Sequence, residues 1–134
     1  TMQHYTGILI EESLANKHTL NAFIIRATKV KPVTPEHKTP WVKQWTMHSV
    51  EVPEQEIEAA TSALSKALDP HHAWYVDLKN DRMHYIIFAN RVFSIDRAHP
   101  EDYAKAEQHG VHLGIPEYQL DFSPHSTEWQ REHA

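Results

Sequence analysis

Histidine is the residue type in this chain that could carry chemistry. The 134 residues include 12 histidines and no cysteine. Without cysteine the chain cannot use a thiolate nucleophile, form a disulfide or build a cysteine-based zinc site. An imidazole can act as an acid, a base or a metal ligand near neutral pH. The candidate sites are therefore the places where histidines fall close to carboxylates or to one another.

The candidate catalytic residues are Asp77, His84 and Tyr85, which flank a predicted hairpin turn. A carboxylate beside an imidazole can orient the ring as a general base. Whether these groups meet depends on the register of the hairpin. A three-residue loop at residues 80–82 places Asp77 opposite Tyr85 and turns His84 to the other face. An even-numbered loop instead places Asp77 across from His84, at a Cβ separation of about 4.5–5.5 Å.

We favour the three-residue loop because it extends one apolar face onto the next strand. A two-residue turn at residues 90–91 would place Phe88 opposite Phe93. The shared face would then consist of Trp74, Val76, Leu78, His84, Ile86, Phe88, Phe93 and Ile95. In this register Asp77 and His84 point to opposite faces, so the catalytic interpretation requires the alternative register.

The candidate metal ligands are His109 and His112, which share one face of a predicted helix because they are three residues apart. Two ligands are too few for a structural zinc site. A third ligand could come from His99, His125 or His133, but the sequence does not place them. We favour the alternative that both rings lie near a helix C-terminus, where a protonated imidazole gains about 0.3–1 kcal/mol.

A third histidine pair, His71 and His72, opens the stretch DPHHAWYVDL at residues 69–78. The alternating run that follows predicts a strand, and successive side chains of a strand point to opposite faces. Both rings therefore cannot reach one metal from within the strand. We interpret the pair as the polar start of a strand after a proline turn.

The apolar periodicity predicts the elements that must position these residues. Strands are expected at residues 5–10, 20–30, 41–52, 73–78, 83–89 and 92–95. Helices are expected at residues 53–68 and 100–114, each with a proline in its first turn. The order β-β-β-α-β-β-β-α predicts an α+β fold, a mainly antiparallel sheet of five to six strands with two helices packed on one face. A ferredoxin-like variant fits the helix spacing only in part.

A single globular domain is expected at residues 2–122, because a chain of this length can bury a self-sufficient core. Ile115, Leu120 and Phe122 are expected to pack back on that core. Residues 123–134 are polar and predict a C-terminal tail. No apolar run reaches the roughly 18 residues that a membrane helix needs, and no secretion signal opens the chain. This predicts a soluble cytoplasmic protein.

Charge and glycine content exclude two common classes of function. The formal charge is -5, and the 13 lysines and arginines are spread along the chain, which argues against a nucleic-acid surface. The chain has three glycines and none of the usual phosphate-binding motifs, which argues against a common nucleotide-binding fold. We expect no bound cofactor.

Several phrases of the sequence resemble a family of small uncharacterised bacterial proteins. They are the opening YTGILIEESL, the WYVDL to YIIFANRVF hairpin and the closing HLGIPEYQLDFSP. The resemblance covers most of residues 2–124. It implies a compact bacterial domain, and it brings no activity, ligand or catalytic residue with it.

Two classes of function follow. We favour a non-enzymatic intracellular module that binds a protein partner or a small ligand, or forms a homodimer, through a sheet face that the helices leave uncovered. Tyr75, Tyr85 and Ile87 would lie on that face. The alternative is a small histidine-dependent enzyme or a divalent-metal-binding protein that uses the histidines described above.

Overall fold

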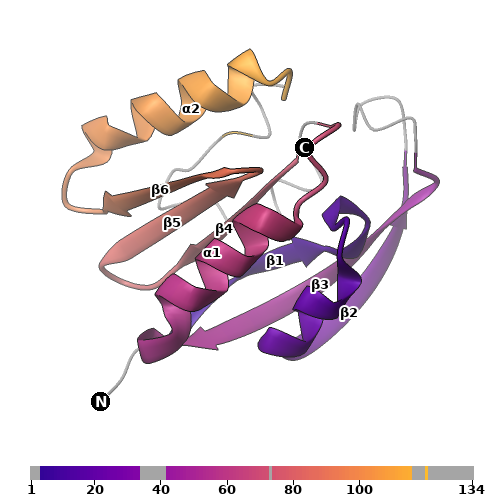
Figure 1. Cartoon of the computed structure of the whole chain (residues 1–134). Coiled ribbons are helices and arrows are strands. Elements are labelled where there is room, and N and C mark those ends of the chain that lie inside the picture. Colours follow the sequence, from indigo (N-terminus) through magenta and orange to yellow (C-terminus); the bar gives the residue numbers. More distant parts are fainter. Residues whose placement is uncertain (1–3, 34–41, 73, 116–119, 121–134) are drawn as a thin grey trace.

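The computed structural model of the chain describes residues 4–33, 42–72, 74–115 and 120. Six strands form one sheet in the order β2-β3-β1-β4-β5-β6, and every neighbouring pair is antiparallel (Figure 1). The strands are β1 (His4–Ile10), β2 (Ile24–Pro32), β3 (Gln44–Pro53), β4 (Tyr75–Lys79), β5 (Met83–Phe88) and β6 (Arg91–Asp96). The helices are α1 (Ile57–Ala67) and α2 (Tyr103–His112), with the short 3-10 helices η1 (Glu11–Ser13), η2 (Lys17–Ala22), η4 (Glu54–Glu56) and η5 (Pro100–Asp102). The α+β class and the order of strands and helices are confirmed.

The strand β2 and the helix α1 both begin later than predicted. Residues 17–22 form η2, so β2 begins at Ile24 rather than at residue 20. Pro53 ends β3, and α1 begins at Ile57 after the single turn of η4. The fixed φ of proline is compatible with an extended residue as well as with the first turn of a helix. A proline at this boundary therefore does not decide which element it belongs to.

The sheet carries a hydrophobic core on each face. The α1 core joins Ile87 of β5 to Leu64 of α1, and the α2 core joins Ile86 of β5 to Ala106 of α2. Neighbouring residues of a strand point to opposite faces, so α1 and α2 cover opposite faces of the sheet (Figure 1). The expected placement of both helices on one face is therefore wrong. The α2 core also contains Phe88, Ile95, Tyr103, Ile115 and Leu120.

The predicted packing of the segment after α2 is visible at two positions. Ile115 and Leu120 are buried in the α2 core, as expected. Phe122 and the expected tail at residues 123–134 lie outside the described residues.

The uncovered sheet face that the sequence suggested is not a single surface. Ile87 is completely buried under α1. Tyr85 packs half-buried against the α1 core, whereas Tyr75 packs against the α2 core on the opposite face. The expectation fails because β5 is apolar on both faces, and a strand of this kind is covered on both sides.

The favoured hairpin register is also wrong. Lys79 is the partner of His84, so the four residues 80–83 connect the two strands. Val76 consequently pairs with Ile87 and shares its face. The even-numbered connection reverses which residues of β5 lie beside the apolar residues of β4.

A side chain in the turn fixes this register. The Asn80 carbonyl oxygen Oδ1 accepts hydrogen bonds from the backbone N–H groups of Arg82 at 2.9 Å and Met83 at 2.8 Å. The backbone N–H of Asn80 donates to the carbonyl of Met83 at 3.0 Å. An asparagine that bonds to the backbone ahead of it stabilises a tight turn. Asn80 therefore closes a four-residue connection instead of the expected three-residue loop.

The second turn is displaced by one residue from its predicted position. Phe88 pairs with Arg91, so Ala89 and Asn90 form the turn, and Asn90 has a φ of 62°. Asparagine tolerates this left-handed conformation, which tight hairpin turns require. Phe88 and Phe93 are not direct partners, but they share a face and their ring centroids are 5.8 Å apart.

Candidate functional site

Asp77, His84 and Tyr103 form a hydrogen-bonded chain inside the α2 core. His84 Nε2 lies 2.6 Å from Asp77 Oδ2, and His84 Nδ1 lies 2.8 Å from the Tyr103 hydroxyl. The three residues are only 3, 1 and 7 % exposed, respectively. Asp77 pairs directly with Ile86, so His84 reaches the carboxylate along the diagonal of the same face. The structure thus brings together two of the three candidate catalytic residues.

Tyr85 does not join this chain. It belongs to the opposite face, where its ring makes an edge contact with Tyr5 at a centroid distance of 5.4 Å. Tyr103 of α2 supplies the hydroxyl instead. Sequence analysis treated Tyr103 only as an apolar helix position, because locating its hydroxyl requires knowing which sheet face α2 covers.

The proton positions in the chain follow from the state of the phenol. Burial raises the pKa of Tyr103, the Arg97 charge lowers it, and the Asp77 charge raises it, with a net upward shift. Tyr103 is therefore protonated at neutral pH and can donate to His84 Nδ1. The Nε2–H of the His84 ring then donates to the Asp77 carboxylate.

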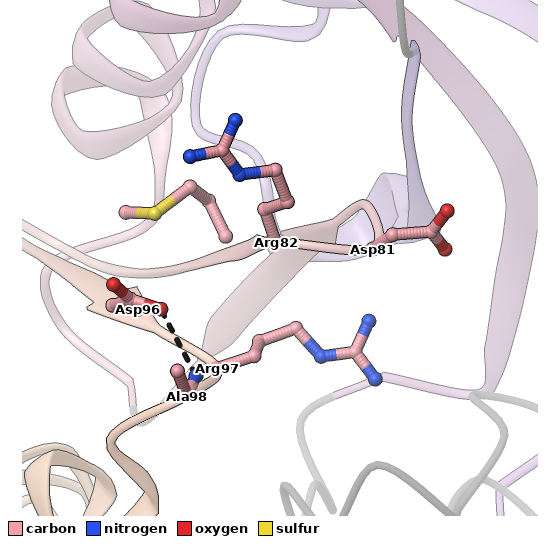
Figure 2. Close-up of a pocket in the computed structure, with 6 residues that line it drawn as sticks. Asp81, Arg82, Asp96, Arg97 and Ala98 are labelled. Atoms are coloured by element: carbon pink, nitrogen blue, oxygen red, sulfur yellow. Dashed lines mark hydrogen bonds between the residues drawn. The ribbon is translucent and has the colours of Figure 1, made fainter.

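Arg97 connects this buried chain to the surface. Its guanidinium lies within hydrogen-bonding reach of the Tyr103 hydroxyl, and it also donates to the backbone carbonyl of Asn80. The same half-buried side chain lines an open cavity of about 530 Å³ at the end of the β4–β5 hairpin. The cavity is lined by Asp81, Arg82, Met83, Asp96, Arg97 and Ala98 (Figure 2).

Backbone contacts hold the walls of this cavity together. Met83 is the strand partner of Asp96, and the N–H of Arg97 donates to the carbonyl of Arg82 at 2.9 Å. The Asp96 carboxylate accepts a hydrogen bond of 2.9 Å from the Ala98 N–H, which is the dashed line in Figure 2. The turn after β4 and the segment after β6 therefore form one connected wall.

A second carboxylate–histidine–hydroxyl chain lies at the other end of the sheet. His48 Nδ1 is 2.8 Å from Thr28 Oγ1, and His48 Nε2 is 3.0 Å from Glu11 Oε1. Lys17 Nζ is 4.0 Å from the other Glu11 oxygen. The imidazole is buried, but Thr28 is exposed on the edge strand β2. Sequence analysis missed this cluster, because Glu11 meets His48 only after η1 folds back over β3.

The candidate metal ligand His109 lies among aromatic rings. The His109 ring packs against Phe88 and Phe93, at centroid distances of 4.7 and 5.7 Å. Burial lowers the pKa of His109, and the charges of Arg91 and His112 lower it further. The ring is therefore neutral near pH 7, and the expectation that a helix end favours its protonated form is wrong for His109.

The metal-binding interpretation stays a prediction. Among the described residues, no group of three or more histidine, aspartate or glutamate side chains is placed to hold a metal ion. His99 lies 3.5 Å from Glu101, while His125 and His133 are outside the described residues. Within the described part of the chain, His109 Nε2 is buried and makes no hydrogen bond.

The pair His71 and His72 forms a capped turn with Asp69. The Asp69 carboxylate accepts the His71 backbone N–H at 2.8 Å and lies 2.7 Å from His72 Nδ1. Burial raises the pKa of Asp69, but these hydrogen bonds outweigh it and the net shift is downward. The arrangement is the polar start of a strand that the sequence suggested.

Comparisons of the chain with protein-family models, curated proteins and solved structures gave no match. The resemblance to small bacterial proteins therefore stays a prediction. Within the described residues, no helix has the length and apolar character needed to cross a membrane. The possible roles of the sites must be argued from their own geometry.

Proposed function

We propose that the protein is a non-enzymatic intracellular module that binds a small polar ligand in the cavity beside Arg82 and Arg97. The observation that carries this proposal is the state of Arg82. Arg82 is one of the residues that line the cavity, yet its guanidinium makes no hydrogen bond or ion pair with the described residues. A guanidinium offers five N–H donors in a fixed fork, so a ligand oxygen can satisfy several of them together.

The size and construction of the cavity support the same proposal. Its volume of about 530 Å³ falls within the range of about 300–1,000 Å³ that is common for small-molecule sites. The Asn80 hydrogen bonds and the strand pair between Met83 and Asp96 fix the backbone of its walls. A site that is formed in advance loses less entropy when its ligand binds.

A small ligand is favoured over a protein partner because of where the apolar surface lies. The residues expected to form a docking face do not share one surface, because Ile87 is completely buried under α1 and Tyr75 packs against the α2 core. Four of the six residues that line the cavity, by contrast, are charged. The cavity therefore suits a polar molecule of limited size.

A thermal-shift screen of small polar metabolites against the full chain tests this proposal. A ligand of the cavity should raise the melting temperature of the wild type, and Arg82→Gln should weaken its binding by about tenfold or more. Arg26→Gln is the matched control, because Arg26 lies on β2 at the opposite edge of the sheet and pairs with Glu51. Equal stabilisation of wild type and Arg82→Gln by every hit would reject the site.

A second candidate function is a histidine-dependent hydrolase that uses Thr28, His48 and Glu11. The exposed Thr28 hydroxyl is hydrogen-bonded to an imidazole whose other nitrogen contacts a carboxylate. This is the composition of a nucleophile, its base and the group that orients the base. Thr28 Oγ1 would attack the ester carbonyl and pass its proton to His48, which would give that proton to the departing alkoxide and release the alcohol. Water would then attack the acyl-threonine ester, release the acid and restore the Thr28 hydroxyl.

Hydrolysis of p-nitrophenyl acetate distinguishes this candidate. Thr28→Val and His48→Gln should abolish any protein-dependent hydrolysis, whereas Thr6→Val changes another exposed threonine and should leave the rate unchanged. If Thr28→Val hydrolyses the ester as fast as the wild type, the hydrolase candidate is rejected. Hydrolysis that requires Thr28 would overturn the non-enzymatic part of the first proposal, whereas binding of a ligand in the cavity does not depend on that result.

A further inference from the structure

We infer that the ligand of the cavity is a small zwitterion, a free amino acid or short amino-carboxylic acid with one carboxylate and one ammonium group. The inference rests on the proposed ligand-binding function and names the class of ligand. It is carried by the charges that line the cavity. These are two guanidinium groups, from Arg82 and Arg97, and two carboxylates, from Asp81 and Asp96.

The four charges are not equally available to a ligand. Arg97 already donates to the Asn80 carbonyl and reaches the Tyr103 hydroxyl, and Asp96 accepts the Ala98 N–H. Asp81 and Arg82, by contrast, make no side-chain hydrogen bond or ion pair with the described residues. One cation and one anion are therefore left to recognise a ligand.

Asp81 and Arg82 are neighbours in the turn, but they do not neutralise each other. Figure 2 shows their side chains pointing in different directions from the turn, with the Arg82 guanidinium turned away from the Asp81 carboxylate. The Asn80 hydrogen bonds to the turn hold this backbone in place. The cavity therefore presents its two unpaired charges as separate groups.

The balance of charge excludes ligands that carry a single sign. A monoanion could pair with Arg82 but would lie beside the carboxylates of Asp81 and Asp96 without neutralising them. A monocation would meet the two guanidinium groups in the same way. A zwitterion places an opposite charge against each unpaired group, and its net charge of zero matches that of the cavity.

Calorimetric titration of the full chain with a matched series of small molecules tests the inference. The zwitterions are glycine, 4-aminobutanoate and 6-aminohexanoate, which vary the distance between the two charges. Butanoate and butylammonium are the matched single ions, because each lacks one charged group of 4-aminobutanoate. At least one zwitterion should bind, and both single ions should bind about tenfold more weakly or worse.

Variants at the two unpaired residues complete the test. Arg82→Gln and Asp81→Asn should each weaken binding of that zwitterion by about tenfold or more, while the control Arg26→Gln leaves it unchanged. Both residues are exposed in the turn, so the melting temperature of each variant without ligand verifies its fold. The ligand series on the wild type gives an answer even if a variant fails to fold.

The outcomes separate the ligand class from the proposed function. If butanoate binds as tightly as 4-aminobutanoate, and Arg82→Gln weakens both, the cavity is an anion site and the zwitterion class is wrong. Binding of butylammonium that Asp81→Asn abolishes would overturn the class in the opposite sense. If neither this series nor the metabolite screen yields a ligand that Arg82→Gln weakens, the proposed function fails as well.

Discussion

The two carboxylate–histidine–hydroxyl chains contain the same kinds of groups in opposite surroundings. Asp77, His84 and Tyr103 are all buried between the sheet and α2. In the other chain His48 is buried, but its hydroxyl partner Thr28 is exposed. The difference shows that hydrogen-bonded geometry alone does not define a catalytic group. A substrate can reach the second chain, whereas the first must act mainly by holding β4, β5 and α2 together.

The free energy lost when a hydrogen-bond partner is removed should differ between the two chains. Removing the partner of a fully buried hydrogen-bonding group costs about 1–3 kcal/mol, because the remaining group is left without a partner or water. Removing a partly exposed partner costs about 0.5–1.5 kcal/mol, because water replaces it. Substitutions in the two chains therefore measure burial as much as they measure hydrogen bonding.

The largest effect is expected from Asp77→Ala. It leaves the His84 Nε2–H without an acceptor in a site that water does not reach, so the free energy of unfolding should fall by about 1.5–3 kcal/mol. The matched change in the other chain is Glu11→Ala, for which we expect about 0.5–1.5 kcal/mol. Urea denaturation of both variants measures the difference. Equal losses would show that the two chains do not differ as their burial indicates.

Removing the hydroxyl group of each chain should give a smaller difference in the free energy of unfolding. Tyr103→Phe keeps the ring in the α2 core but takes the donor from His84 Nδ1, which should cost about 1–3 kcal/mol. Thr28→Val removes the exposed hydroxyl beside His48 and should cost less than about 1 kcal/mol. The comparison is again made by urea denaturation. A Tyr103→Phe variant as stable as the wild type would mean that His84 finds another partner.

His109 extends the comparison to a half-buried ring that has no hydrogen bond to a carboxylate among the described residues. Its pKa is lowered in the folded protein, so below its usual value of about 6.5 the unfolded chain binds the proton more readily. Stability should therefore fall as the pH drops from about 7.5 to about 5.5. His109→Phe should reduce this loss, whereas the exposed His18→Gln should not. Denaturation curves at both pH values decide, and an unchanged pH dependence in His109→Phe would contradict the assignment.

The smallest effect is expected at the partly exposed turn of Asp69 and His72. The pKa of Asp69 is lowered in the folded state, so its contribution is present above about pH 3.9 and is lost as the pH falls through the folded value. Asp69→Asn should cost less than about 1 kcal/mol at neutral pH. The difference from wild type should vanish in strongly acidic solution. A difference that persists there would point to a packing effect instead of the carboxylate charge.

The amphipathic elements were accessible to sequence analysis because their periodicity is local. The spacing of Ile57, Ala60 and Leu64 marks the buried stripe of α1, and all three are buried as that spacing predicts. The sequence also predicted that the histidines at residues 71–72 form the polar start of a strand, because this depends only on a turn and on the alternation of side chains along a strand.

The predictions that were wrong or missing concern strand register and the packing of helices on the sheet. Counting apolar residues could not reveal that Asn80 closes a four-residue connection, and that one side chain determines whether Asp77 and His84 meet. Tyr103 and Glu11 could not be assigned for a related reason. Each reaches its histidine only through the docking of a separate element, α2 or η1, onto a particular face of the sheet.

The position of α2 also has a consequence for local unfolding. Tyr103 is the link between α2 and the buried chain in the sheet, and α2 lies on the opposite face from α1. Detachment of α2 alone would admit water to His84 and Asp77 while the α1 core stayed intact. Amide hydrogen exchange of β5 would then report this opening event without global unfolding.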